Sequence, residues 1–203
     1  MLFFSYRCDK VLLILFFNGG ENYGEIKRKK AQLKQNFDYY FGNKYDKYLD
    51  NKDNIKEILG DNFGFKNREE NFKLSVCTFD IFKYICEKEM IAQKDVIFES
   101  NFRTHEMEYL DTLAHKYNYE ILTIVINADI NVLHQRFMNR INNENRHAVH
   151  KAVDLSDINV FNKQILDDRD RKYYGKVLKL DSTNFDNIYN DKVITLVSKF
   201  IKE

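Results

Sequence analysis

The chain has 203 residues, a formal net charge of +1 and 44% hydrophobic residues. This composition excludes a disordered chain, and the near-zero charge excludes the broad basic surface of a nucleic-acid-binding protein. The length predicts one domain over residues 1–203. The longest apolar run, Val11–Phe17, is far shorter than the roughly 20 residues that span a bilayer, and no small-residue cleavage site follows it. We therefore expect a cytoplasmic protein with no membrane partner.

The chain contains three cysteines, Cys8, Cys77 and Cys86. An odd number without a CxxC spacing predicts neither a disulfide framework nor a zinc site. We expect buried, unreactive thiols in a reducing compartment.

Apolar patterns predict strands and helices that alternate along the chain. In order, we expect a strand at 11–17, a helix at 25–41, a short strand at 48–49, a short helix at 54–59, a loop at 60–67, a long helix at 72–90, a strand at 95–99, a helix at 107–117, a strand at 120–126, a helix at 133–141, an aperiodic polar segment at 142–157, a helix at 160–174, a strand at 177–180 and a closing helix at 193–201. The strand at 11–17 is apolar on both faces, which is typical of parallel sheets covered by helices on both sides, and the strand at 95–99 is expected to be buried as well. The pattern predicts a three-layer α/β fold with a mostly parallel sheet.

Three glycines, Gly19, Gly20 and Gly24, follow the first apolar strand. Gly19 and Gly24 have the spacing of the phosphate-binding loop G-x-x-x-x-G-K-[ST], in which backbone N–H groups bind phosphate. Glu25 and Ile26 stand where the lysine and the hydroxyl of that motif belong. Lys27 is a candidate replacement cation, and a glycine-rich turn without a ligand is the alternative.

Polar side chains also follow two later positions where strands are expected to end. Asp53 is a candidate to orient or deprotonate a hydroxyl nucleophile, and its alternative role is that of a helix N-cap. Glu99 is a candidate for the hydration shell of Mg²⁺ or for a base, and Arg103 for a substrate or phosphate contact. A polar loop that ends the strand is the alternative for this second group.

Arg136, Arg140 and Arg146 lead into the aperiodic segment. Arg136 and Arg140 share a helix face at i, i+4 spacing. Together the three arginines predict a mobile lid around residues 136–157 that closes on a triphosphate. A solvated basic face is the alternative. His147 and His150 lack a third metal ligand nearby, so a histidine metal site is not expected.

The runs Lys52–Leu59, Asp95–Arg103 and Arg136–His150, in this order after the glycines, resemble the zeta-toxin-like P-loop kinases, small proteins often labelled AAA-family ATPases. The resemblance implies a five-stranded parallel sheet, ATP, Mg²⁺ and phosphotransfer to the hydroxyl of a small-molecule acceptor. It implies catalytic roles for Asp53, Glu99, Arg136 and Arg140, with Glu99 near Mg²⁺ through a water molecule. Together with the glycine motif and the replacement cation, we expect nucleotide binding by Gly19, Gly20, Gly24, Lys27 and Arg146, and substrate binding by Asp50, Asn101 and Arg103.

Glu25 and Ile26 leave three hypotheses open. The protein is an ATP-dependent phosphotransferase, a nucleotide-binding module without turnover, or an active kinase whose N-terminal reading frame is disrupted. For one choice of codons at positions 24–27, a reading frame shifted by one base encodes Gly-Lys-Ser, which is the end of the phosphate-binding motif. The nucleotide sequence therefore tests the third hypothesis.

Overall fold

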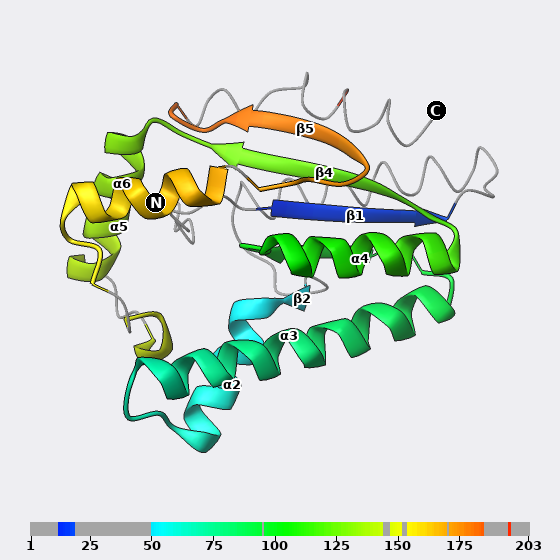
Figure 1. Ribbon diagram of the computed structural model, residues 1–203, viewed down its shortest axis with the longest axis horizontal. Coiled ribbons are helices and arrows are strands. Elements are labelled where there is room, and N and C mark those ends of the chain that lie inside the picture. Colours follow the sequence, from blue (N-terminus) through cyan, green and yellow to red (C-terminus); the bar gives the residue numbers. More distant parts are fainter. Residues whose placement is uncertain are drawn as a thin grey trace.

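The computed structural model describes residues 12–18, 50–94, 96–143, 147–151, 154–169, 171–184 and 195 (Figure 1). Within these ranges, only the backbone is described for residues 12–18, 50–51, 96–97, 99, 143 and 166–169. The expected helices at 25–41 and 193–201 lie outside the described residues, apart from residue 195. Of the described helices, none is both long and apolar enough to cross a membrane.

Strands and helices alternate as the apolar patterns predict. The strands are β1 (Leu12–Asn18), β2 (Asp50–Asn51), β3 (Val96–Ser100), β4 (Tyr119–Asn127) and β5 (Lys176–Asp181), and the helices are α2 (Lys52–Phe63), α3 (Arg68–Ile91), α4 (Thr104–Tyr117), α5 (Ile130–Asn143), a short 3-10 turn (Ala148–His150) and α6 (Ile158–Arg169). The loop predicted at 60–67 is wrong in its first part, because α2 continues to Phe63 and ends at Gly64, whose φ of +66° suits a helix C-terminus. Residues 171–174 are not helical, so the helix predicted at 160–174 is too long.

The five strands form one sheet in the order β2-β3-β1-β4-β5. Parallel pairing is confirmed for β2 with β3 and for β4 with β5. The prediction is wrong for β1, which runs antiparallel to both of its neighbours, with Leu12 opposite Ser100 and Asn18 opposite Tyr119. Figure 1 shows the β1 arrow pointing away from the edge at which β4 and β5 end. A strand that is apolar on both faces carries no mark of direction, so sequence reasoning could not detect this reversal.

A large core lies between the sheet and helices α3 and α4, which pack on β3 and β4 (Figure 1). Its centre is aromatic, and Phe82 is fully buried there. The ring centroid of Phe82 lies 4.3 Å from that of Phe98 and 5.7 Å from that of Phe102. Burial on this scale supplies most of the free energy of folding. The core therefore fixes α3 and α4 on one face of the sheet.

A second, smaller core joins α5 to α6 at the edge where β4 and β5 end (Figure 1). At its centre, the ring centroids of Phe137 and Phe161 lie 5.4 Å apart. The carboxyl ends of β3, β4 and β5 thus share one edge of the sheet, and the residues predicted to act chemically follow these strands.

Candidate functional site

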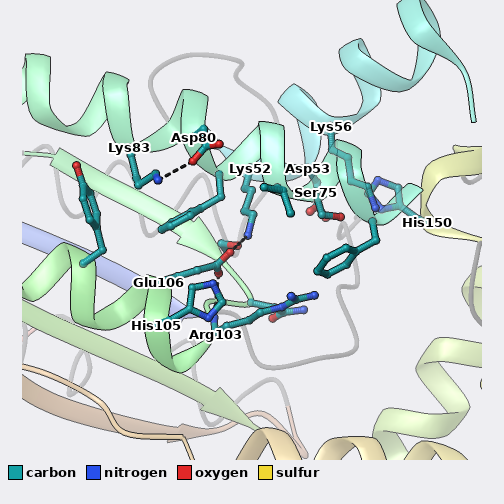
Figure 2. Close-up of a pocket in the computed structure, with 16 residues that line it drawn as sticks. Lys52, Asp53, Lys56, Ser75, Asp80, Lys83, Arg103, His105, Glu106 and His150 are labelled. Atoms are coloured by element: carbon teal, nitrogen blue, oxygen red, sulfur yellow. Dashed lines mark hydrogen bonds and ion pairs between the residues drawn. The ribbon is translucent and has the colours of Figure 1, made fainter. Parts of the chain in front are cut away.

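A pocket of about 520 Å³ lies where β3 ends, between α2, α3 and the start of α4 (Figure 2). We call it the β3-edge pocket. Its lining residues are Lys52, Asp53, Lys56, Phe72, Ser75, Val76, Phe79, Asp80, Lys83, Ser100, Asn101, Arg103, His105, Glu106, Tyr109 and His150. The volume is within the range of small-molecule sites in proteins.

The pocket brings together three of the predicted site residues, Asp53, Asn101 and Arg103. Asn51 of β2 lies beside Glu99 of β3 in parallel register, so the residues that follow the two strands meet at one edge. Asp53 lies in the first turn of α2, which begins at Lys52, so the N-cap alternative for Asp53 is wrong. Asp50 and Glu99 lie in the paired strands, where their side chains are not described.

A buried ion pair forms the floor of the β3-edge pocket. Lys52 Nζ lies 2.6 Å from Glu106 Oε1, and the two side chains are 13% and 5% exposed. The second carboxylate oxygen of Glu106 accepts the backbone N–H of Arg103 at 2.9 Å. Lys52 at the start of α2 is therefore tied to the start of α4. Sequence reasoning missed this pair, although an acid three residues after the N-cap position of a helix is the spacing of a capping box.

Arg103, a cation of this pocket, forms no ion pair with a carboxylate within the described part of the chain. Its guanidinium lies over the ring of Phe72, 4.9 Å from the centroid. Lys83 pairs with Asp80 at 2.6 Å, and Lys56 donates to Asn71 Oδ1 at 2.6 Å. An exposed guanidinium stacked on an aromatic ring presents its N–H donors sideways, which suits a carboxylate or a phosphate.

The remaining walls of the pocket are mostly apolar or aromatic. Phe72 and Val76 of α3 are about half exposed, although both are apolar. Burial raises the pKa of the Tyr109 hydroxyl, and the nearby charge of Glu87 adds to this effect. The phenol is thus held in its protonated form, which can donate a hydrogen bond. The pocket combines an apolar side with cationic and hydroxyl groups.

Arg136 and Arg140 lie on α5, away from the residues that line the β3-edge pocket. Arg136 donates to the backbone oxygens of Ser182 at 2.8 Å and Thr183 at 3.2 Å, just after β5. Arg140 is 5% exposed, so the alternative of a solvated basic face is wrong for it. Its Nε, like Asn127 Oδ1 at the end of β4, is buried without a hydrogen-bond partner in the described part of the chain.

The glycine segment begins at the other edge of the sheet. Gly19, Gly20, Gly24 and Lys27 lie outside the described residues, as does Arg146. Asn18, directly before them, lies beside Tyr119, at the edge where β4 starts. The expectation that these glycines follow a strand ending beside Asp53 is therefore wrong, because β1 is reversed.

His147 and His150 each bind a carboxylate of α2: Asp61 at 2.9 Å and Glu57 at 2.8 Å. Among the described residues there is no group of three or more His, Cys, Asp or Glu suited to a metal ion. Cys86 is buried as expected, whereas Cys77 is exposed on α3, because the helix turns that position away from the core.

Comparisons with known proteins find a likeness in structure. No protein-family model matches the chain, and no curated protein matches it. Its structure is similar to a protein of Chloroflexus aurantiacus described as a putative kinase, with a TM-score of 0.62 and 19% sequence identity over 88% of this chain and 89% of the other. At this identity the likeness shows the fold alone. The chain thus has a fold similar to that of the Chloroflexus protein.

Proposed function

We propose that this protein binds a small hydroxyl compound that carries an acidic group, and that it transfers a phosphoryl group from ATP to the hydroxyl. The observation that carries the proposal is the β3-edge pocket, where Asp53, Asn101 and Arg103 meet. A carboxylate, an amide and a guanidinium that stacks on Phe72 at one strand edge suit the recognition and activation of a polar acceptor.

Each of these residues has a role that follows from its chemistry. Asp53 orients the acceptor hydroxyl and accepts its proton. Arg103 binds the acidic group of the acceptor through a charge-assisted hydrogen bond, and its contact with Phe72 holds the guanidinium in place. Asn101 adds a neutral hydrogen bond. Among the four cationic and three carboxylate side chains of the lining, Arg103 has no opposite charge beside it within the described residues, which favours an acidic acceptor over a neutral one.

The donor side fits ATP in part. The buried Nε of Arg140, which has no hydrogen-bond partner among the described residues, is the kind of group that a phosphate would satisfy, and Arg136 lies one turn before it on the same helix face. The glycine side does not fit, because Glu25 and Ile26 replace the lysine and hydroxyl and because β1 is reversed. When bound, ATP with Mg²⁺ would supply the phosphoryl group and neutralise its charge, and Glu99 is the candidate for the Mg²⁺ hydration shell.

The reversal of β1 also favours a second candidate function, which is binding of the acidic compound without phosphotransfer. In this case the β3-edge pocket keeps its ligand, while ATP binds weakly or not at all. The double substitution Glu25→Lys and Ile26→Ser separates the two candidates, since it should strengthen ATP binding in a protein that has lost turnover. The nucleotide sequence over codons 24–27 tests whether the reading frame there is intact.

The test is an assay of ADP release with ATP, Mg²⁺ and pairs of hydroxyl compounds that differ by one carboxylate or phosphate. We expect turnover with the acidic member of a pair. Arg103→Ala should raise KM for that member by about 10-fold to 100-fold, which is the value of one charge-assisted hydrogen bond, and should leave the neutral member unchanged. Asp53→Asn should lower kcat by about 100-fold or more. Lys88→Ala is the matched control, because Lys88 also lies over an aromatic ring, that of Tyr84, away from the pocket.

Two outcomes separate the candidates. If no compound raises ADP release above the protein-free background, phosphotransfer is wrong. If acidic compounds still raise the melting temperature of the wild type but not of Arg103→Ala, the binding function stands. If acidic compounds raise neither ADP release nor the melting temperature of the wild type, the pocket does not have the role proposed for it.

A further inference from the structure

The chain from His147 to Lys151, which we call the histidine turn, is anchored to helix α2. His147 Nε2 lies 2.9 Å from Asp61 Oδ1, and His150 Nε2 lies 2.8 Å from Glu57 Oε1. Carboxylates only accept hydrogen bonds, so Nε2 of His147 and Nε2 of His150 each carry a proton. Two separate side-chain bonds to one helix fix both the position and the direction of the turn.

Val149, between the two histidines, is held from α3 as well as from α2. Its side chain is 1% exposed, and its carbonyl oxygen accepts Asn71 Nδ2 at 2.9 Å and Lys56 Nζ at 3.3 Å. On α2 the valine needs the space left by Gly60, where an added Cβ would lie 2.3 Å from Val149 Cγ1. The turn is therefore built into a site formed by both helices.

The histidine turn also belongs to the wall of the β3-edge pocket. His150 lines the pocket, and so does Lys56, which bonds the Val149 oxygen (Figure 2). Figure 2 shows His150 and Lys56 together at one end of the pocket, with Arg103 and His105 along another side. Release of the turn from α2 would open that end of the pocket to water.

We propose that the histidine turn is a closing element of the β3-edge pocket, and that His147 and His150 are positioning residues that hold it closed. His147 has a second task, because its Nδ1 accepts the backbone N–H of Val149 at 3.2 Å. The neutral ring with its proton on Nε2 makes both bonds at once. This proposal concerns access to the pocket and does not depend on ATP or on phosphotransfer.

A tryptophan at position 72 makes closure measurable. The chain has no tryptophan, and Phe72 lines the pocket next to Asn71, so Phe72→Trp places a single tryptophan at this wall, which can be excited selectively at about 295 nm over the tyrosines. In that background we expect the double variant His147→Ala with His150→Ala to raise acrylamide quenching about twofold. We also expect it to speed hydrogen exchange of the amides in the turn about tenfold. His150→Gln, which keeps an N–H donor for Glu57, should restore most of the protection that His150→Ala loses.

His115→Ala is the matched control. His115 pairs with Asp111 on the surface of α4 at 3.7 Å, so its loss removes a histidine–carboxylate pair that joins no two elements. We expect it to change neither quenching nor exchange. Gly60→Ala is a second perturbation that leaves both histidine side chains in place. Its methyl group would overlap Val149 Cγ1, whereas it would come no closer than 3.4 Å to His147 Cε1, an ordinary van der Waals contact. The substitution should raise quenching even though alanine favours helix formation over glycine.

The proposal is overturned if quenching and exchange in the double alanine variant equal those of the reporter parent while circular dichroism is unchanged. If the double variant unfolds, Gly60→Ala decides, and unchanged quenching in that variant overturns the proposal. Loss of ATP turnover alone bears on the proposed function and not on the turn.

Discussion

Replacement of Lys52 by methionine tests the ion pair at the floor of the β3-edge pocket. Methionine keeps an unbranched apolar side chain, so it retains much of the packing against Phe79, whose ring centroid lies 5.1 Å from Lys52 Nζ. It removes the charge that lies 2.6 Å from Glu106 Oε1. The carboxylate of Glu106, 5% exposed, is then left with the backbone N–H of Arg103 as its remaining hydrogen bond in the described structure.

The size of the effect follows from burial. Loss of one partner of a buried ion pair destabilises a protein by about 3–5 kcal/mol, because the other charge stays buried without compensation. Lys52 keeps slight contact with solvent, at 13% exposed, so we expect the lower end, about 3 kcal/mol. For a chain of this size, this lowers the melting temperature by about 6–12 °C. Loss of the tie between α2 and α4 should also weaken binding in the pocket.

The assay is urea unfolding of four proteins: wild type, Lys52→Met, Glu106→Gln and the double variant. The amide introduced by Glu106→Gln keeps an oxygen for the Arg103 N–H and carries no charge, so the double variant should recover most of the stability lost by either single one. Lys73→Met is the control, because Lys73 and Glu69 form an i,i+4 pair that is 68% and 79% exposed, and such pairs contribute little. The reasoning is refuted if Lys52→Met unfolds at the same urea concentration as Lys73→Met, or if the losses of the two single variants simply add.

Two further predictions concern β5. Gly175→Ala should destabilise the protein by several kcal/mol, measured by urea unfolding. The φ at this position is +68°, and the new Cβ would lie 2.2 Å from the backbone oxygen of Ile121. A variant as stable as wild type would contradict this. The pKa of Asp181 is lowered from its usual 3.8, chiefly by hydrogen bonds from the side chain and backbone of Thr183. A lowered carboxyl pKa contributes stability that is present above pH 3.8 and is lost as pH falls through the lowered value. Melting temperatures across this range should therefore show a deficit for Asp181→Ala that shrinks on acidification, and a deficit of constant size would contradict the assignment.

Local sequence patterns predicted most of the described elements, because these elements bury one consistent face. The spacing of Phe79, Phe82, Cys86 and Met90 marks the buried side of α3, and all four lie in the core. β4 differs, because its run Ile121–Val125 is buried on both faces of the sheet. Chain order also made Asp53 and Arg103 candidates, since each follows an expected strand end, and parallel β2 and β3 carry these residues to a shared edge.

Other features depend on contacts between residues far apart in sequence. The Lys52–Glu106 pair spans 54 positions and the His150–Glu57 bond spans 93, so no local spacing reveals them. Gly60 reads as the start of a loop in the sequence, whereas in the fold it is a helical residue that leaves space for Val149. In such cases the residue that fits a position depends on a neighbour that is close only in the folded chain.

The amino-acid sequence by itself determined that a strand would form in the apolar run Val11–Phe17, and the backbone of β1 is a strand over Leu12–Asn18. Only the tertiary structure decided the direction of that strand. Reversal of a strand that is apolar on both faces buries the same side chains, so the hydrophobic effect does not distinguish the two directions. Pairing with β3 and β4 decides between them, and it places the residue before the glycines at the edge away from Asn101 and Arg103.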